Sequence, residues 1–244
     1  MEVDPQYLKK IQLELAFWEK KNLAKPKAWN RYAAKIQAKI NGLIPQKVHN
    51  GIKVTVQQMV KGMLFGAMQI PQLKNLEEFS LVQRELLIKK LIDNYSHGGA
   101  VEGAICGAGG FMMSLADFPA LIAIKIKLLF DVANYYGFST HDYKERLFLL
   151  YVFQLAFSNP NQLAQTYQIV TNWEETRKSL PDYIDDFDWH SFQQEYRDYL
   201  DLAKMAQLLP IIGSAVGAIT NYNLLKKLGM TAMNAYRMRI LKTL

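Results

Sequence analysis

A stretch of thirteen residues, 98–110, contains six glycines and a single carboxylate, Glu102. A flexible linker of this composition would be polar, but the stretch also carries Val101 and Ile105. A phosphate-binding loop requires a lysine followed by serine or threonine, and a dinucleotide fingerprint requires a preceding strand; the sequence offers neither. The stretch is therefore expected to form a helix that packs unusually closely against a neighbour.

Glycine recurs at every fourth position in this stretch, so one face of the helix would be nearly bare backbone. Each glycine that replaces an alanine costs a helix about 1 kcal/mol, so several in one helix need a packing reason. The segment 210–225 repeats the spacing and is the natural neighbour. The glycines predicted to bring the two helices together are Gly99, Gly103, Gly107, Gly213 and Gly217.

The glycine-rich region also has to be weighed as a membrane span, since residues 98–116 number nineteen and carry one charge, Glu102. A carboxylate in the middle of a helix is costly in lipid, and the helix expected next carries Lys125 and Lys127. The apolar run at 208–219 is too short to cross a bilayer. A buried pair of helices is preferred, and a true membrane span is the alternative.

Apolar residues recur with the helical period along nearly the whole chain, and no segment alternates as a strand would. Asp117 is expected to cap a new helix with Pro119 in its first turn, and 147–157 to form a central buried helix because it is apolar all round. We predict one all-α domain of about nine to eleven helices. Basic N-terminal helices (1–44) would precede the main helical body (45–244).

Charge is sorted along the chain, which has 29 Lys and Arg, 22 Asp and Glu and a net charge of +7. No acid lies between Lys20 and Leu76, where there are eleven cations, or from Leu202 to the C-terminus, where there are six. Such segregation indicates that the two regions either pack against the acidic one or present a basic face to an anionic partner.

The first residues carry no apolar run, so no secretory signal is expected. The single cysteine, Cys106, excludes an internal disulfide framework and suits a reducing compartment. A cytoplasmic location is the default expectation, and the oligomeric state is left open.

The candidate binding surface is a basic helix predicted over 26–43. Four cations recur on one face of it at intervals of four residues: Lys27, Arg31, Lys35 and Lys39. They would repel one another unless an anionic surface or the acids of 171–201 faced them. With Trp29 or Trp18 as an interfacial anchor, this face suits an anionic membrane. Nucleic acid is the third choice, because Lys outnumbers Arg by 22 to 7 and no nucleic-acid motif is present.

Two segments carry motifs that can be compared with a known family. The first is GGAVEGAICGAGGFMMSLADFPALIAIKIKLL, in which a glycine-rich run precedes Asp117-x-Pro119. The second is DWHSFQQEYRDYLDLAKMAQLLPIIGSAVGAITNYNLL, whose signature positions are Asp188, Trp189, Glu195, Arg197 and, after a Pro-x-x-Gly-x-x-x-Gly segment, Asn221. In this order, over roughly 45–240, the chain resembles the EcsC family of bacterial proteins.

The resemblance implies little about chemistry. The family is named from an operon that it shares with an ABC transporter, and an association with membranes is the general expectation. It has no established enzymatic activity, so no catalytic residue is carried over, and the signature residues are interpreted as structural. Glu102 and Cys106 depart from the small or apolar residues expected at their positions.

An acidic cluster contains residue types that ligate metals: Asp185, Asp186, Asp188 and His190. It matches no known metal-loop spacing, so a solvated turn with helix caps is preferred. His97 and Glu102 lie five residues apart and do not share a helical face well. No catalytic triad, Cys-His pair or HExxH motif can be assembled. We expect no catalytic residue, metal or cofactor.

The sequence favours a non-enzymatic, peripheral membrane protein at the inner face of the cell membrane, an accessory or regulator of a membrane machine such as an ABC transporter. One alternative is a hydrolase that uses acidic residues of 185–197 or Asp117. The other is a cytosolic binding module whose basic face holds an acidic protein or nucleic acid.

Overall fold

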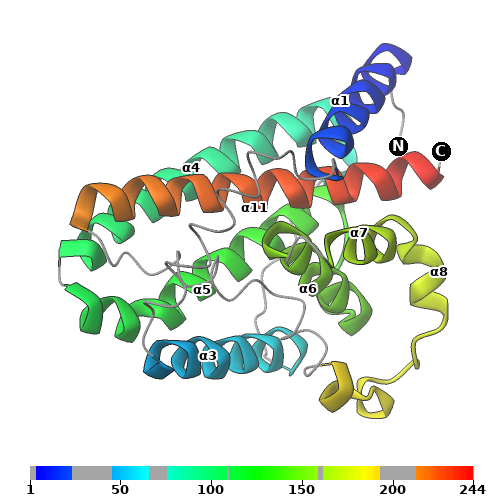
Figure 1. The fold of residues 1–244 in the computed structure, drawn as a ribbon. Coiled ribbons are helices and arrows are strands. Elements are labelled where there is room, and N and C mark those ends of the chain that lie inside the picture. The colour runs from blue at the N-terminus through cyan, green and yellow to red at the C-terminus, as the bar shows by residue number, and fades with distance from the viewer. Residues whose placement is uncertain are drawn as a thin grey trace.

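The structure is a computed structural model that describes residues 4–23, 46–65, 76–108, 110–158, 162–192 and 213–243. All regular secondary structure in these ranges is helical, which confirms the predicted all-α class (Figure 1).

The centre of the fold is a pair of long helices, α4 (Leu81–Ala108) and α11 (Gly213–Thr243), which lie side by side and antiparallel (Figure 1). Helix α5 (Gly110–Tyr136) packs against both. Helix α3 (Gln46–Phe65) packs against α5 and α6 (Tyr143–Phe157). The shorter helical elements are η1 (Leu76–Glu78), α7 (Leu163–Thr171), α8 (Trp173–Lys178) and η2 (Ile184–Asp186).

Helix α6 confirms the buried helix predicted over 147–157. Every residue of that segment except Tyr151 is buried. The helix begins at Asp142, whose Oδ1 accepts a hydrogen bond of 2.8 Å from the backbone N–H of Lys144. Gly137, with a φ of +88°, follows the last residue of α5 in the left-handed conformation that glycine adopts without strain.

The boundary predicted after the glycine-rich stretch is wrong. Helix α4 continues through that stretch to Ala108, and α5 already begins at Gly110, so 98–116 is not one helix. Asp117 therefore lies inside α5 rather than at an N-cap, and Pro119 is an interior proline. Pro119 is exposed, so water can bond the carbonyl that its missing N–H leaves free, and the apolar pattern carries the helix across it.

The start of α4 was also missed. Ser80 and Gln83 form a reciprocal capping box, in which the backbone N–H of Ser80 donates to Gln83 Oε1 at 2.9 Å. The backbone N–H of Gln83 donates in return to Ser80 Oγ at 3.3 Å. This cap separates α4 from the short η1 turn.

Helix α1 (Pro5–Leu23) crosses the C-terminal half of α11 (Figure 1). Its Ile11 and Leu15 belong to the same hydrophobic core as the central helices. Trp18 packs on Tyr167 of α7, with ring centroids 6.1 Å apart, so it is not the free anchor considered above. The predicted division at residue 44 falls outside the described residues and stays a prediction.

Candidate functional site: buried arginines of the C-terminal helix

Arg237 is the most heavily bonded side chain of α11. It is 2% exposed and meets Glu85 of α4 with two parallel hydrogen bonds, of 2.8 Å from Nε and 2.6 Å from Nη2. Its Nη1 donates to Glu14 of α1 at 2.8 Å. A single guanidinium therefore joins three helices whose residues are far apart in the sequence.

Two tyrosines complete the coordination of Glu85. Tyr7 of α1 donates to Glu85 Oε2 at 2.6 Å, and Tyr136 of α5 donates to Glu85 Oε1 at 3.0 Å. Burial, followed by the neighbouring Glu85 carboxylate, raises the pKa of both phenols. Burial lowers the pKa of Arg237, but the hydrogen bonds and charge of Glu85 outweigh it and the net pKa is raised. The two phenols and the guanidinium are thus held in the protonated form that donates hydrogen bonds to Glu85.

Arg239 forms a second cluster on the other side of α11. Its Nη1 donates to Glu145 of α6 at 2.8 Å and its Nε to Glu174 of α8 at 2.9 Å. The guanidinium lies over two aromatic rings, 4.1 Å from the centroid of Phe138 and 4.5 Å from that of Phe148. Burial raises the pKa of Glu145 although Arg239 opposes the shift. Desolvation is therefore the larger effect on this carboxylate.

The two clusters perform a structural task. Side chains two residues apart point away from each other on a helix, so Arg237 binds α4 and α1 while Arg239 binds α6 and α8. Replacing a buried ion pair with apolar groups is often neutral, whereas removing one member leaves an uncompensated charge. The clusters fix the register of α11 against its neighbours, and they hold the carboxylates of Glu85 and Glu145 in ion pairs.

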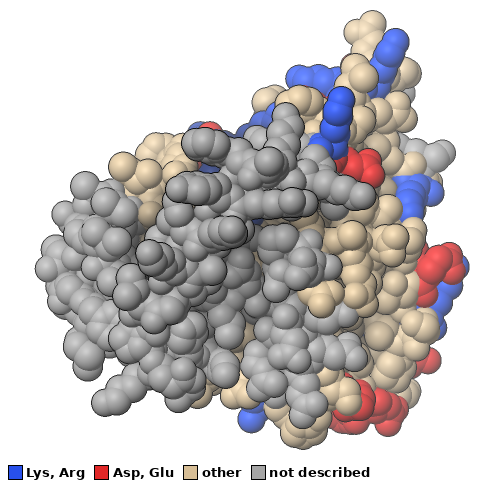
Figure 2. All heavy atoms as spheres, viewed as in Figure 1, with Lys and Arg blue, Asp and Glu red and all other residues tan. Residues whose placement is uncertain are grey.

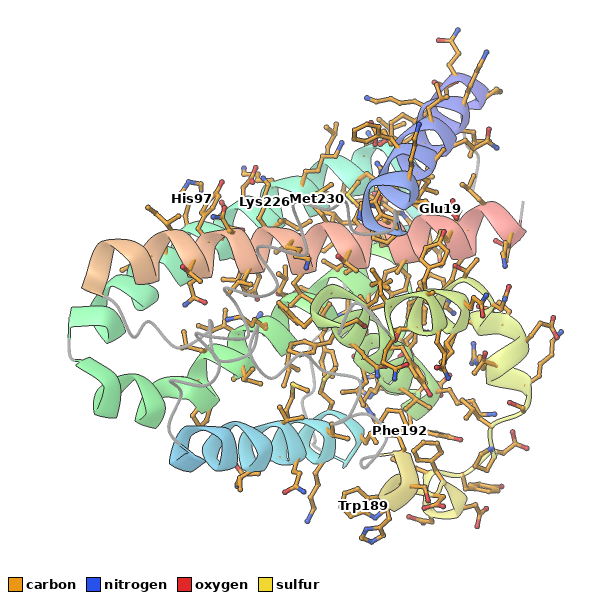
Figure 3. The ribbon with its side chains drawn as sticks, viewed as in Figure 1. Glu19, His97, Trp189, Phe192, Lys226 and Met230 are labelled. Atoms are coloured by element: carbon orange, nitrogen blue, oxygen red, sulfur yellow. The ribbon has the colours of Figure 1, made fainter. Side chains whose placement is uncertain are left out.

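Other cations of α11 also face acidic or carbonyl oxygens. Lys226 forms an ion pair with Asp93 of α4, beside which it lies in Figure 3. Lys242 donates to the carbonyl of Thr171 at 2.6 Å and to Asn172 Oδ1 at 3.0 Å. The sorting of charge along the sequence allowed two interpretations: packing of the basic regions against acidic ones, or a basic face presented to an anionic partner. Arg237, Arg239 and Lys226 follow the first, because each forms an ion pair with an acid of another helix.

Asn221, a residue of the family signature, is buried where α11 meets α5. Its Oδ1 accepts a hydrogen bond of 3.0 Å from Lys125 Nζ, which also donates to the Leu121 carbonyl at 3.1 Å. Lys125 is fully buried, although its charge alone suggested an exposed position. The contact is consistent with a structural role for Asn221, which stays a prediction.

The central helices approach closely at two glycines. A Cβ at Gly99 of α4 would collide with Leu225 of α11, and a Cβ at Gly229 of α11 would lie 2.6 Å from Ile92 Cγ1 of α4. Gly229 was missed because it lies outside the two glycine-rich segments. The predicted contacts of Gly103, Gly107, Gly213 and Gly217 involve positions outside the described side chains and stay predictions.

The acidic cluster lies on an exposed turn. Asp185 and Asp186 belong to η2, and Asp188 caps the helical turn that follows, its Oδ1 accepting from the Ser191 N–H at 3.1 Å. The hydrogen bonds from Ser191 lower the pKa of Asp188. The ring of His190 packs on Trp189, with centroids 4.4 Å apart, and Figure 3 shows Trp189 at the edge of the molecule. Across the described ranges, no group of three potential ligands could hold a metal ion.

Several predicted residues cannot be placed. Those outside the described ranges are Lys27, Trp29, Arg31, Lys35, Lys39, Glu195 and Arg197, and the side chains of Glu102, Cys106 and Asp117 are likewise not described. Where helices are described, none combines the length and the hydrophobicity that crossing a bilayer would require.

The buried arginine clusters were not predicted, because each ion pair joins residues distant in the sequence. A signal was nevertheless present. Arginine is rare in this lysine-rich chain, yet Arg237 and Arg239 alternate with Tyr236, Met238 and Ile240 in the last helix. Arginine among apolar neighbours indicates a buried guanidinium bound by carboxylates.

Helices arranged in this way define an all-α protein whose long C-terminal helix is bound on opposite sides by buried arginine–glutamate pairs. The chain matches the EcsC protein family over residues 9–241, and it therefore belongs to that family. The resemblance found in its motifs is confirmed, and the match begins within α1 rather than near residue 45.

Two proteins of Bacillus subtilis (strain 168) are similar in sequence. The chain is 42% identical to Protein EcsC over 239 residues, which are 98% of this chain and 97% of that protein. It is 29% identical to Uncharacterized protein YdbA over 148 residues, 60% of this chain and 54% of that one. No solved structure matches the chain.

Proposed function

We propose that this protein binds the anionic inner face of the cell membrane without catalysing a reaction, as an accessory or regulator of a membrane machine such as an ABC transporter. The observation that carries the proposal is the acid-free stretch between Lys20 and Leu76, with its eleven cations. The other acid-free region uses Lys226, Arg237 and Arg239 in ion pairs within the protein. In the first region, the described Lys20 and Lys61 are exposed.

The charge of this stretch is sufficient for reversible binding. Each Lys or Arg close to an anionic bilayer contributes about 1 kcal/mol of attraction, and the attraction falls off within a Debye length. The four cations predicted on the face of 26–43 would therefore give a binding that salt weakens. The transporter part of the proposal rests on the operon context that the family resemblance implies.

The proposal that the protein is not a catalyst is supported by the structural contacts of three acids. Glu85 and Glu145 bond to buried arginines, and Asp188 caps a helix. A hydrolytic activity that is lost in Asp188→Ala would contradict this part.

Vesicle flotation tests the membrane proposal. We expect the wild-type protein to float with vesicles containing phosphatidylglycerol, and not with vesicles of phosphatidylcholine alone. The variant Lys27→Glu/Arg31→Glu/Lys35→Glu/Lys39→Glu should bind at least about a hundredfold more weakly, because four attractive charges become repulsive.

Two controls make the result specific. Charge reversal elsewhere, in Lys90→Glu/Lys178→Glu, alters two exposed lysines outside the acid-free stretch and should leave flotation nearly unchanged. Duplex DNA is added as a competitor at physiological salt. Wild-type protein that floats with neither kind of vesicle would overturn the proposal, and displacement by DNA would favour a nucleic-acid-binding module.

A further inference from the structure

Helix α1 has two faces of different chemistry. Its inner face carries Ile11 and Leu15, which lie in the core, and Tyr7, which donates to Glu85. Of the two acids of α1, Glu14 turns toward the body of the protein, whereas Glu19 is exposed at its edge. Glu14 forms an ion pair of 2.8 Å with Arg237, and Glu19 lies where the end of α1 meets the body, close enough to affect the pKa of Tyr167 (Figure 3).

The outer face of α1 combines apolar and basic side chains. Leu13 is 66% exposed and Phe17 is 70% exposed, and they lie one helical turn apart. Lys9 lies one turn before Leu13, and Lys20 lies one turn after Phe17; both lysines are exposed. We call these four residues the outer stripe. Helical geometry places Glu14 and Glu19 on either side of this stripe, so the outer stripe itself contains cations and apolar groups and no acid.

The position of α1 makes this stripe accessible. The helix projects from the body at the upper right of Figure 1. The space-filling view shows basic and uncharged side chains exposed along this projection and acidic atoms only at its base (Figure 2). Two neighbouring large apolar side chains that are mostly exposed are unfavourable in water unless a surface covers them part of the time.

We infer that the outer stripe of α1 docks on an anionic lipid bilayer, with Leu13 and Phe17 in the interfacial region and Lys9 and Lys20 at the lipid phosphates. The inference rests on the proposed function and adds a second, apolar contact to it. A row of apolar side chains flanked by lysines is the arrangement of helices that lie in the plane of a membrane surface. The long lysine stems allow the ammonium groups to remain at the headgroups while the apolar side chains go deeper.

Charge favours a bilayer over a second copy of the chain. In a symmetric dimer the stripe would face its own copy, bringing the lysines of both together and raising the electrostatic cost. An anionic bilayer offers negative phosphates around an apolar interior, which complements the whole stripe. The chain also passes from Lys20 directly into the acid-free stretch, so the two basic surfaces are adjacent in the sequence.

The decisive variant removes the apolar groups without changing any charge. In Leu13→Gln/Phe17→Gln, both positions are exposed and glutamine favours helix, so the fold should be unaffected. The matched control, Ile219→Gln/Tyr183→Gln, also replaces one aliphatic and one aromatic side chain, at positions 63% and 74% exposed and away from α1. Circular dichroism and the unfolding midpoint in urea establish that both variants are folded.

Binding is measured as partitioning onto vesicles of mixed phosphatidylglycerol and phosphatidylcholine. We expect the α1 variant to partition about tenfold more weakly than the wild type, and the control to partition as the wild type does. The remaining binding of the α1 variant should be more sensitive to salt, because charge alone then holds the protein on the vesicle.

The outcomes separate the two proposals. If the wild type floats and the α1 variant floats equally well, the docking of α1 is refuted while the proposed function stands. If the wild type does not float, both are refuted. If the α1 variant floats equally well and size-exclusion chromatography shows that only the wild type self-associates, the stripe binds a second copy of the chain instead.

Discussion

Helices α11 and α1 have similar cation contents and opposite arrangements of charge. In α11, Arg237 and Arg239 are each 2% exposed and bonded to glutamates of four other helices. In α1, Lys9 and Lys20 are exposed, while Glu14 faces inward and forms an ion pair with Arg237. The comparison shows that a basic segment does not by itself indicate a basic surface, since Arg237 and Arg239 of α11 form ion pairs inside the protein.

The chemistry of the two cations explains part of this difference. Arginine has a planar guanidinium that is weakly hydrated and can bond two carboxylate oxygens at once, as Arg237 does with Glu85. The lysine ammonium is strongly hydrated and carries a long flexible stem, so it is more stable at a surface in contact with water. Lys125 departs from this pattern, since it is buried and bonded to Asn221.

The largest change in stability is expected when a buried arginine of α11 is replaced. Arg237→Met should lower the free energy of unfolding by about 3–5 kcal/mol, because Glu85 would keep its charge in the core without its cation. Urea denaturation measures the change. The double variant Arg237→Met/Glu85→Met should recover part of the loss, since it removes both charges. A loss below about 1 kcal/mol in the single variant would contradict the view that Arg237 neutralises Glu85.

The close approach of α4 and α11 gives an intermediate effect. Gly229→Ala should cost about 1–3 kcal/mol, because the new methyl group would lie 2.6 Å from the branched Ile92. Gly98→Ala is the matched control, since no atom lies within 4 Å of its added Cβ, and it should stabilise the protein by roughly 0.5–1 kcal/mol. Thermal unfolding of both variants measures the difference. Equal stability of the two would show that the helices can separate without loss.

The smallest change in stability is expected when the exposed lysines of α1 are replaced. Lys9→Gln/Lys20→Gln should change the free energy of unfolding by less than about 0.5 kcal/mol, because neither ammonium is buried. Urea denaturation is again the measurement, with Arg237→Met as the opposite limit. A loss as large as that of Arg237→Met would mean that these lysines stabilise the body and are not available to a membrane.

Local sequence rules predicted the parts of the fold that depend on neighbouring residues. The segment 147–157 is buried, as expected from its apolar residues all round, and Asp142 at the start of α6 and Gly137 at the end of α5 follow ordinary capping chemistry. The same rules placed a helix start at Asp117, where α5 runs through Pro119. Proline fits the first turn of a helix but does not require a helix to begin there, and the exposed Pro119 is accommodated inside α5.

The sequence by itself therefore determined the helical class, the family and the sorting of charge along the chain. Only the tertiary structure decided which cations are buried, because Arg237 meets Glu85 across 152 residues and no local pattern encodes that pairing. It likewise decided that Glu14 faces inward to Arg237, which leaves the face of Leu13 and Phe17 exposed. The physical reason is that the free energy of a charge depends on what packing brings beside it, whereas helix formation depends mainly on nearby residues.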